Sequence, residues 1–112
     1  MKIYVTYPYT AKTPEQEKEN VIKSIDIAIK IWQKGHTPFI PLLLHYFNKR
    51  VKELNLSISY DEYMKWDLEW LNECDALLYT IKSKGTDIEL NEAIEKRKIV
   101  YWSVDEIEDR GV

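Results

Sequence analysis

Residues 76–97 read ALLYTIKSKGTDIELNEAIEKR and contain an apolar run, a short turn and a helical pattern in that order. The run at 76–81 is apolar, aromatic and β-branched, which is typical of a buried strand. A turn follows at 83–86, and a helix is expected from about 86 to 97. Because 98–102 (KIVYW) is again typical of a strand, this part of the chain predicts a strand–helix–strand unit.

The same alternation continues toward the N-terminus. The expected elements there are strands at 2–6 and 37–41 and helices at 14–34, 42–56 and from 59 onward. Strands that alternate with helices predict one α/β domain over 1–112, a three-layer sandwich with a mainly parallel four- or five-stranded sheet of Rossmann or flavodoxin type. Ligands of such folds bind beyond the carboxyl ends of the strands, so segments 6–10, 41–45 and 81–86 should share one rim.

Several local signals set the expected helix boundaries. Thr13 and Pro14 form a helix start, Gly35 is a helix stop, and Ser59 with Glu62 forms a capping box. The helix at 14–34 has apolar residues at helical spacing, namely Val21, Ile22, Ile25, Ala28, Ile29 and Trp32. We expect Trp32, and likewise Trp66 and Trp70, to pack in the core. His36 is expected in a turn.

Composition excludes several classes of protein. The chain has 112 residues and a net charge of −3, which argues against binding of a nucleic-acid backbone. The single cysteine, Cys74, excludes an intramolecular disulfide, and no Cys/His cluster has zinc spacing. No signal-peptide pattern or membrane-length apolar run is present, so we expect a soluble cytoplasmic protein without a membrane partner.

Two carboxylates occupy unusual positions. Asp67 falls within an apolar helical stripe, where an ionised group is costly unless it is bonded or functional. It marks the polar edge of the stripe, caps a neighbouring loop, or has a functional role. Glu89 lies three residues after Thr86 and is either a capping-box partner of Thr86 or an ionised group at the ligand rim. Retaining glycosidases use two carboxyl groups about 5 Å apart, one of them nucleophilic.

Four segments carry a resemblance to a known family. They are KIYVTYPY (2–9), GHTPFIP (35–41), DLEWLNECD (67–75) before an apolar strand, and SKGTDIE (83–89) with Ala93 one helical turn on. Together they resemble the nucleoside 2-deoxyribosyltransferase superfamily, and within it most closely the 2′-deoxynucleoside 5′-monophosphate N-hydrolases. The match covers nearly the whole chain in order.

The resemblance implies roles for three residues in the chemistry. Glu89 matches the nucleophile that attacks the anomeric carbon of the sugar, and Asp67 matches the acid that manages the proton on the leaving base. Tyr4 matches a first-strand tyrosine that hydrogen-bonds near the nucleophile. The resemblance also gives Asp75 a structural role.

It further implies a substrate site at the rim. Ser83 matches a serine that binds the 5′-phosphate, where transferases of free nucleosides tend to carry an acidic residue. Gly85 and Thr86 share that turn, and a helix N-terminus suits phosphate. The remaining binding candidates are Tyr7, Tyr9 and His45, with surface exposure as the alternative for His45.

The sequence departs from the family in its first loop. Tyr7 stands where the family has a small residue, and no arginine occurs in 7–10, so Lys12 or Lys84 would supply the charge for phosphate. Trp70 or Tyr63 is a candidate for stacking on a base.

These observations predict an N-glycosidase acting on a nucleoside 5′-monophosphate, a small-molecule partner, through a covalent glycosyl-enzyme on Glu89. The alternatives are a deoxyribosyltransferase that exchanges bases and a nucleotide-binding sensor without turnover. No metal or organic cofactor is expected. The resemblance implies a homodimer or larger homo-oligomer, because members of the superfamily complete their pockets with residues of a neighbouring subunit.

Overall fold

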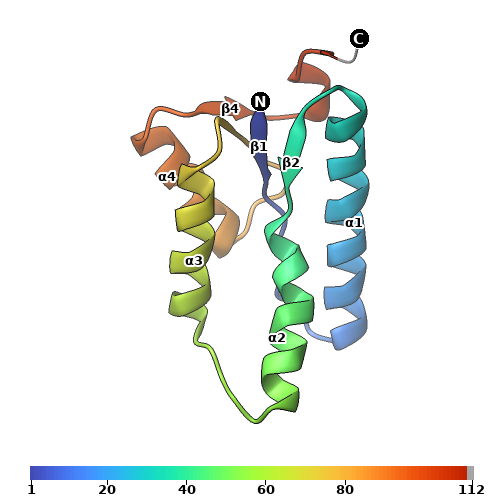
Figure 1. The fold of residues 1–112 in the computed structure, drawn as a ribbon, viewed down its shortest axis with the longest axis vertical. Coiled ribbons are helices and arrows are strands. Elements are labelled where there is room, and N and C mark those ends of the chain that lie inside the picture. The colour runs from blue at the N-terminus through green and yellow to red at the C-terminus, as the bar shows by residue number, and fades with distance from the viewer. Residues whose placement is uncertain (111–112) are drawn as a thin grey trace.

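A parallel sheet with the strand order β2-β1-β3-β4 organises residues 1–110, the part of the chain that the computed structural model describes (Figure 1). The last two residues of the predicted domain lie outside that part. The strands are β1 (Lys2–Val5), β2 (Thr37–Phe39), β3 (Ala76–Leu78) and β4 (Ile99–Tyr101). All three strand pairs are parallel, which confirms the predicted α/β class. The order 2-1-3-4 is that of flavodoxin-like folds, in which the switch point lies between β1 and β3.

Four α-helices connect and flank these strands. They are α1 (Pro14–Gln33), α2 (Leu44–Glu53), α3 (Tyr60–Asn72) and α4 (Lys84–Glu95), with short 3-10 turns η1 (Pro41–Leu43) and η2 (Val104–Glu106). Thr13 caps α1, and Gly35 after its end has a φ of 88°, a conformation that favours glycine. The capping box of Ser59 and Glu62 is present at the start of α3.

Four predicted boundaries were wrong by two or three residues. β2 and β3 end two to three residues earlier than expected, at Phe39 and Leu78. The helix expected from 42 begins at 44, because residues 41–43 form the tighter 3-10 turn that Pro41 opens. The helix expected from Thr86 begins at Lys84, because Ser83 is its N-cap.

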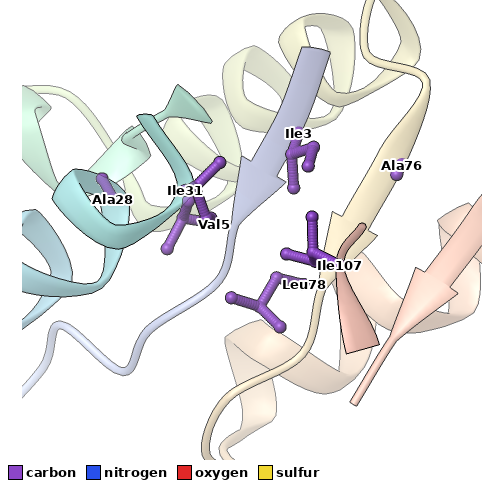
Figure 2. Close-up of a cluster of buried hydrophobic side chains, with 7 residues drawn as sticks. All are labelled: Ile3, Val5, Ala28, Ile31, Ala76, Leu78 and Ile107. Atoms are coloured by element: carbon purple, nitrogen blue, oxygen red, sulfur yellow. The ribbon is translucent and has the colours of Figure 1, made fainter. Parts of the chain in front are cut away.

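The two faces of the sheet hold separate apolar clusters. Figure 2 shows the first one, in which alternate residues of β1 and β3 meet α1 and the segment after η2. It consists of Ile3, Val5, Ala28, Ile31, Ala76, Leu78 and Ile107. The second cluster, on the face of α3 and α4, consists of Tyr4, Leu71, Cys74, Leu77 and Ala93. The side chains of β1 therefore alternate between faces, and Tyr4 points to the side of α3 and α4.

The observed core face of α1 is rotated about the helix axis relative to the predicted one. Trp32 is 67% exposed, and Ile22 and Ile29 are also exposed. The buried face instead runs through Val21, Ser24, Ala28 and Ile31. The prediction from apolar residues was right for Val21 and Ala28 but missed Ser24, whose hydroxyl donates to the Val21 carbonyl at 2.7 Å.

The amino end of the sheet is fastened by contacts distant in sequence. Asp75 accepts a 2.8 Å hydrogen bond from the Lys2 amide, a structural role of the kind the resemblance implied. His36 directly follows the turn at 34–35 and is buried, and its two ring nitrogens contact the Met1 amino group and the Glu108 carbonyl. None of the helices in residues 1–110 has the length and apolar character needed to span a membrane.

Two isoleucines of α1 provide a test of this packing. Ile31→Ala removes a fully buried side chain from the first cluster and should lower the free energy of unfolding by about 2–5 kcal/mol. Ile29→Ala on the same helix is the matched control, since Ile29 is 45% exposed, and should change it by less than about 1 kcal/mol. Urea unfolding measures both. Equal losses would contradict the orientation of α1.

Candidate active site

A cavity of about 530 Å³ opens beyond the carboxyl ends of the strands. Its volume is that of a small-molecule site. Residues of all three predicted rim segments line it, together with side chains of α2, α3 and α4. The lining residues are Tyr7, Pro8, Tyr9, Thr10, Pro41, Leu42, Leu44, His45, Asn48, Tyr60, Tyr63, Met64, Asp67, Ser83, Lys84, Gly85, Thr86 and Glu89.

The chain beyond β1 and β3 is held in place by two threonines. The Thr6 hydroxyl donates to the Leu78 carbonyl at 2.9 Å and accepts from the Thr80 amide at 3.1 Å. The Thr80 hydroxyl in turn donates to the Thr6 carbonyl at 2.6 Å. These bonds extend the pairing of β1 and β3 past the ends of the strands, so the two loops that leave them reach the cavity from fixed positions.

Glu89 lies in the cavity wall and is only 5% exposed. The hydroxyl of Tyr4, which is fully buried, donates a hydrogen bond to Oε2 of Glu89. Burial first, and then the neighbouring carboxyl of Glu89, raise the pKa of Tyr4 well above its ordinary value. Tyr4 therefore stays protonated and acts as a permanent donor to Glu89.

Glu89 is not the capping-box residue of its helix. Ser83 is the N-cap of α4, and its hydroxyl accepts from the Thr86 amide at 3.1 Å. Glu89 lies in the second turn, with its side chain turned to Tyr4 rather than back to the cap. The alternative role of Glu89, as the capping-box partner of Thr86, is therefore excluded by the register of the helix.

Asp67 reaches the same cavity from α3. Its Oδ1 atom is buried and has no hydrogen-bond partner within residues 1–110, so Asp67 does not cap a loop through that atom. Burial raises its pKa to about 7. A buried carboxyl oxygen without a partner is costly when ionised, so the raised pKa of Asp67 lowers the cost of its position.

The two carboxyl groups affect one another. Burial is the main cause of a pKa of about 8 for Glu89, the Tyr4 hydrogen bond opposes it, and the charge of Asp67 adds to it. Near neutral pH such a pair retains a proton that it can transfer, which suits acid–base chemistry. Within the described part of the chain, no three His, Cys, Asp or Glu side chains are grouped so that they could hold a metal ion.

The start of α4 forms another part of the wall. Its first turn contains Lys84, Gly85 and Thr86, and the amides of a helix start favour an anion. Lys84 places its ammonium group 5.6 Å from the centre of the Tyr60 ring. Lys12, the other cation considered for phosphate, does not line the cavity.

Gly85 lies inside α4 rather than in the turn before it. A Cβ atom there would approach the Tyr60 hydroxyl to 3.3 Å and the Met64 methyl group to 3.5 Å. The absence of a side chain lets the first turn of α4 lie close to Tyr60 and Met64 of α3.

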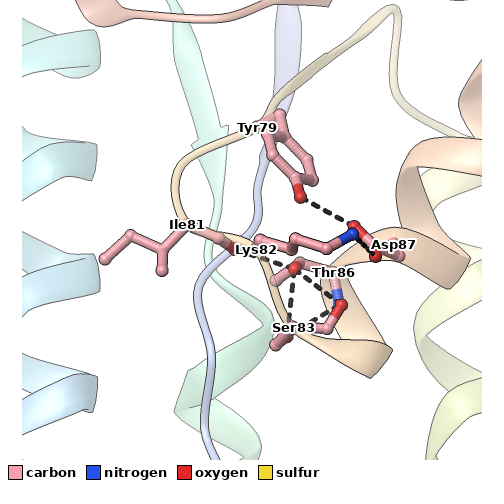
Figure 3. Close-up of polar contacts among 6 residues, drawn as sticks. All are labelled: Tyr79, Ile81, Lys82, Ser83, Thr86 and Asp87. Carbon is pink, nitrogen blue, oxygen red and sulfur yellow. Dashed lines mark hydrogen bonds and ion pairs between the residues drawn. The ribbon is translucent and has the colours of Figure 1, made fainter.

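Figure 3 shows how the turn before α4 is fastened. Asp87 accepts from the Tyr79 hydroxyl at 2.7 Å and pairs with the Lys82 ammonium group at 2.5 Å. The Thr86 hydroxyl donates to the Ile81 carbonyl at 2.8 Å. Sequence reasoning missed Asp87, although an aspartate in the first turn of a helix, with a lysine five residues earlier, was a usable signal.

The far side of the cavity is rich in tyrosine. The Tyr9 hydroxyl and Nδ1 of His45 are 2.6 Å apart, and the Tyr63 hydroxyl donates to Oδ1 of Asn48 at 2.8 Å. His45 thus takes part in the cavity wall, while Asn48 had no distinguishing signal in the sequence. Tyr7 also lines the cavity, where its bulk narrows the space.

Trp70 does not reach the site. Its ring stacks on Phe39 with centroids 5.3 Å apart, and it is half-exposed on a different surface of the sheet. Of the two candidates for stacking on a base, only Tyr63 lines the cavity.

Fold and site define a flavodoxin-like α/β domain with two carboxyl groups, the buried Glu89 and the half-buried Asp67, in a cavity beyond the carboxyl ends of its strands. Comparison with protein-family models gives no match, and comparison with curated proteins gives none either. Among solved structures, the chain is similar to a 2-desoxiribosyltransferase from Leishmania mexicana, with 17% identity and a TM-score of 0.57. The alignment covers 88% of this chain and 61% of that one, so the chain spans less than two thirds of its length. At this identity the likeness shows a shared fold.

The buried carboxyl pair predicts an unusual dependence of stability on pH. The pKa values of about 8 for Glu89 and about 7 for Asp67 lie above those of an unfolded chain, so the folded protein holds protons that the unfolded chain has released. The free energy of unfolding should therefore fall as the pH rises from about 5 to about 8. Chemical denaturation across this range measures the effect.

Glu89→Gln should weaken this pH dependence and be more stable than the parent protein at the alkaline end, because glutamine does not ionise. Glu95→Gln is the control, since Glu95 lies on the same helix but is exposed, and it should leave the slope unchanged. Asp87 has a lowered pKa, so its effect on the free energy of unfolding has the opposite sign and occurs at pH values below this range. Stability that rises between pH 5 and 8 would contradict the buried pair.

Proposed function

We propose that the protein cleaves the N-glycosidic bond of a nucleoside 5′-monophosphate through a covalent glycosyl-enzyme on Glu89. The observation that carries this proposal is that two carboxyl groups line one cavity, the buried Glu89 bonded to Tyr4 and the half-buried Asp67 without a partner at Oδ1 within residues 1–110. Retaining glycosidases work with such a pair. The fold shared with a 2-desoxiribosyltransferase supports the assignment to chemistry at the bond between sugar and base.

The first step starts from the form of the pair in which Glu89 is ionised and Asp67 carries the proton, and an oxygen of Glu89 forms a bond to the anomeric carbon of the sugar. The bond from that carbon to the base nitrogen breaks, and its electron pair goes to the base. Asp67 gives a proton to the departing base, which makes the base a better leaving group. Tyr4 holds the attacking carboxylate by its hydrogen bond and orients it.

In the second step, water attacks the same carbon and the bond to Glu89 breaks. Asp67, now ionised, takes the proton from the water, so both carboxyl groups return to their starting states. The high pKa of Asp67 suits both directions of proton transfer at neutral pH.

The phosphate of the substrate is assigned to the start of α4. Ser83 and the amides of the first turn line the cavity there, and Lys84 carries a positive charge at the same place. A helix N-terminus attracts phosphate through its free amides and its dipole. The contribution of a neighbouring subunit to the pocket remains part of the proposal, and light scattering in solution tests the homo-oligomer that it requires.

Transfer of the sugar to a second base is the other candidate reaction. It is favoured because the similar solved structure is that of a 2-desoxiribosyltransferase, and it would use the same glycosyl-enzyme. A panel of nucleosides and their 5′-monophosphates, each with and without an acceptor base, separates the two reactions by chromatography. Free base without acceptor indicates hydrolysis, and a new nucleoside indicates transfer. Tight binding of nucleotide without release of base would indicate a sensor.

The roles of the carboxyl groups predict different losses. Glu89→Gln should reduce the rate of base release by more than about 10⁴-fold, because it removes the nucleophile. Asp67→Asn should reduce it by roughly 10²–10⁴-fold, and by less for substrates whose base leaves easily, because it removes proton transfer. Mass spectrometry of the protein mixed with substrate should detect a sugar adduct on Glu89. Base release that survives Glu89→Gln would overturn the mechanism, and Glu95→Gln serves as control.

The phosphate assignment predicts a change in substrate preference. Ser83→Asp keeps a good N-cap for α4 but places a carboxylate beside the phosphate. The kcat/KM for the monophosphate should fall tenfold or more, about 1.4 kcal/mol, whereas that for the free nucleoside should not. Ser59→Asp makes the same change at the N-cap of α3, away from the cavity lining, and should leave both values unchanged. Equal losses for both substrates would contradict a phosphate site at Ser83.

A further inference from the structure

Four aromatic side chains form a continuous band across α2, α3 and β2. The rings of Phe47 and Trp66 meet edge to face with centroids 5.1 Å apart, and those of Trp70 and Phe39 stack at 5.3 Å. Trp66 and Trp70 are four residues apart on α3, so the two ring pairs share one face of that helix. Phe47 is 45% exposed and Trp70 is 48% exposed. We call these four residues the aromatic band.

The apolar surface continues from the band along α2. Leu43 and Leu54, which cap α2 at its two ends, lie four and seven residues from Phe47, and both are exposed. Connected exposed apolar surface of this kind marks interaction sites, and aromatic residues are enriched where proteins contact one another. The glycosidic chemistry proposed above uses none of these side chains.

Opposite charges border the band on its two sides. On α3, Glu69 and Glu73 each follow a tryptophan of the band by three residues, so both lie along one border. On α2, Arg50 follows Phe47 by the same spacing. Within residues 1–110, the two carboxylates have no hydrogen bond or ion pair, and Arg50 has only the exposed Glu53 at 3.4 Å. Exposed pairs of this kind contribute little, so these charges remain available to a partner.

The edge of the sheet beside the band does not suit a partner that adds a strand. β2 is an edge strand, and the Thr37 amide donates into the sheet, to the Met1 carbonyl at 2.9 Å. Successive residues of a strand pair to opposite sides, so residue 38 faces the free edge. Pro38 has no N–H to offer there. A partner at this place therefore binds through side chains.

We propose that the aromatic band is the contact surface of a two-fold symmetric homodimer. In such a dimer the same patch occurs on both copies and must be complementary to itself. The band meets this condition, because rings lie at its centre and opposite charges lie at its two borders. Arg50 of each copy then meets Glu69 and Glu73 of the other. A groove of about 550 Å³, lined in part by Trp70 and these two glutamates, receives the guanidinium group.

The band is the outer side of a wall of the cavity. Figure 1 shows α2 and α3 reaching beyond the sheet and joined by a loop. Asn48 and Tyr63 of these helices line the cavity and are hydrogen-bonded at 2.8 Å, while Phe47 and Trp66 belong to the band. Only Val51 of α2 is buried, so the chain's own core holds this helix weakly. A dimer that covers the band should hold α2 against α3.

Two exposed tryptophans provide the first test. Sedimentation equilibrium over a range of concentrations should show that the parent protein forms dimers. Trp70→Ala should raise the dissociation constant roughly tenfold or more, because a symmetric dimer loses the contact twice. Trp32→Ala is the matched control, since Trp32 is 67% exposed on α1 at the other face of the sheet, and should change nothing. A parent protein that is monomeric throughout, or a dimer lost only with Trp32→Ala, would overturn the proposal.

An exchange of charges tests the same interface without removing a ring. Arg50→Glu should be monomeric, and so should the double variant Glu69→Arg, Glu73→Arg, because each places like charges together in its own dimer. An equimolar mixture of the two variants should form dimers, since every pair across the mixed interface is then of opposite sign. Lys30→Glu on α1 is the control and should dimerise as the parent does. Variants that both keep the parent's dissociation constant would contradict the arrangement.

Hydrogen exchange tests the link between the dimer and the cavity without substrate. Amides of residues 44–53 should exchange roughly tenfold faster in Arg50→Glu than in the dimeric parent protein, whereas those of residues 21–31 in α1 should not change. Mixing in the double variant should restore the slow exchange. Equal exchange of α2 in monomer and dimer would reject the claim that the dimer holds this wall.

The effect of the dimer on base release rests on the proposed function, whereas the interface itself does not. A dimer that depends on Trp70 and Arg50, in a protein that releases no base, would support the interface and reject the N-glycosidase. Base release by a protein that stays monomeric at every concentration would support the enzyme and reject the interface. If both hold, the rate of base release per molecule should rise with protein concentration in Arg50→Glu mixed with the double variant and not in either variant alone.

Discussion

The hydrogen bond from Tyr4 to Glu89 joins the centre of the sheet to the first turns of α4, and the rest of the site is arranged around it. Tyr4 is fixed because β1 lies between β2 and β3 and because its ring packs against Phe39. A carboxyl group buried on α4 would be costly without a donor, so Tyr4 makes its position tolerable. Partial retention of the proton, seen in the pKa of about 8, offsets the remaining cost.

The sequence predicted those features whose signals are local. A helix start at Thr13, a stop at Gly35 and a capping box at Ser59 each depend on neighbouring residues, and all three are present. The convergence of three loops at one rim followed from the parallel sheet, because all carboxyl ends meet at one edge. Asp67 stood out because it places a carboxylate in an apolar stripe, and Glu89 because its helix start follows a strand of the parallel sheet at the ligand rim.

What the sequence did not predict depends on residues far apart in the chain. Thr6 and Thr80 extend the pairing of two strands, and hydrogen bonds join Tyr9 to His45 and Tyr63 to Asn48, yet none of these contacts has a local signal in the sequence. Trp32 was placed in the core because large apolar residues dominate a helical pattern. Only the position of the sheet decides that the smaller Ser24 faces inward instead.

On the proposed function, the electrostatics of the cavity explain how one site can bind a phosphate and still contain the carboxylate nucleophile Glu89. Lys84 and the start of α4 supply little positive charge, so two ionised carboxylates beside them would repel a phosphate. Raised pKa values keep the pair partly neutral while the substrate binds. As the bond to the base breaks, the sugar gains positive character and favours ionisation of Glu89. The Tyr4 hydroxyl already stabilises the ionised form of Glu89 through its hydrogen bond. The negative charge of the nucleophile is therefore stabilised in the transition state.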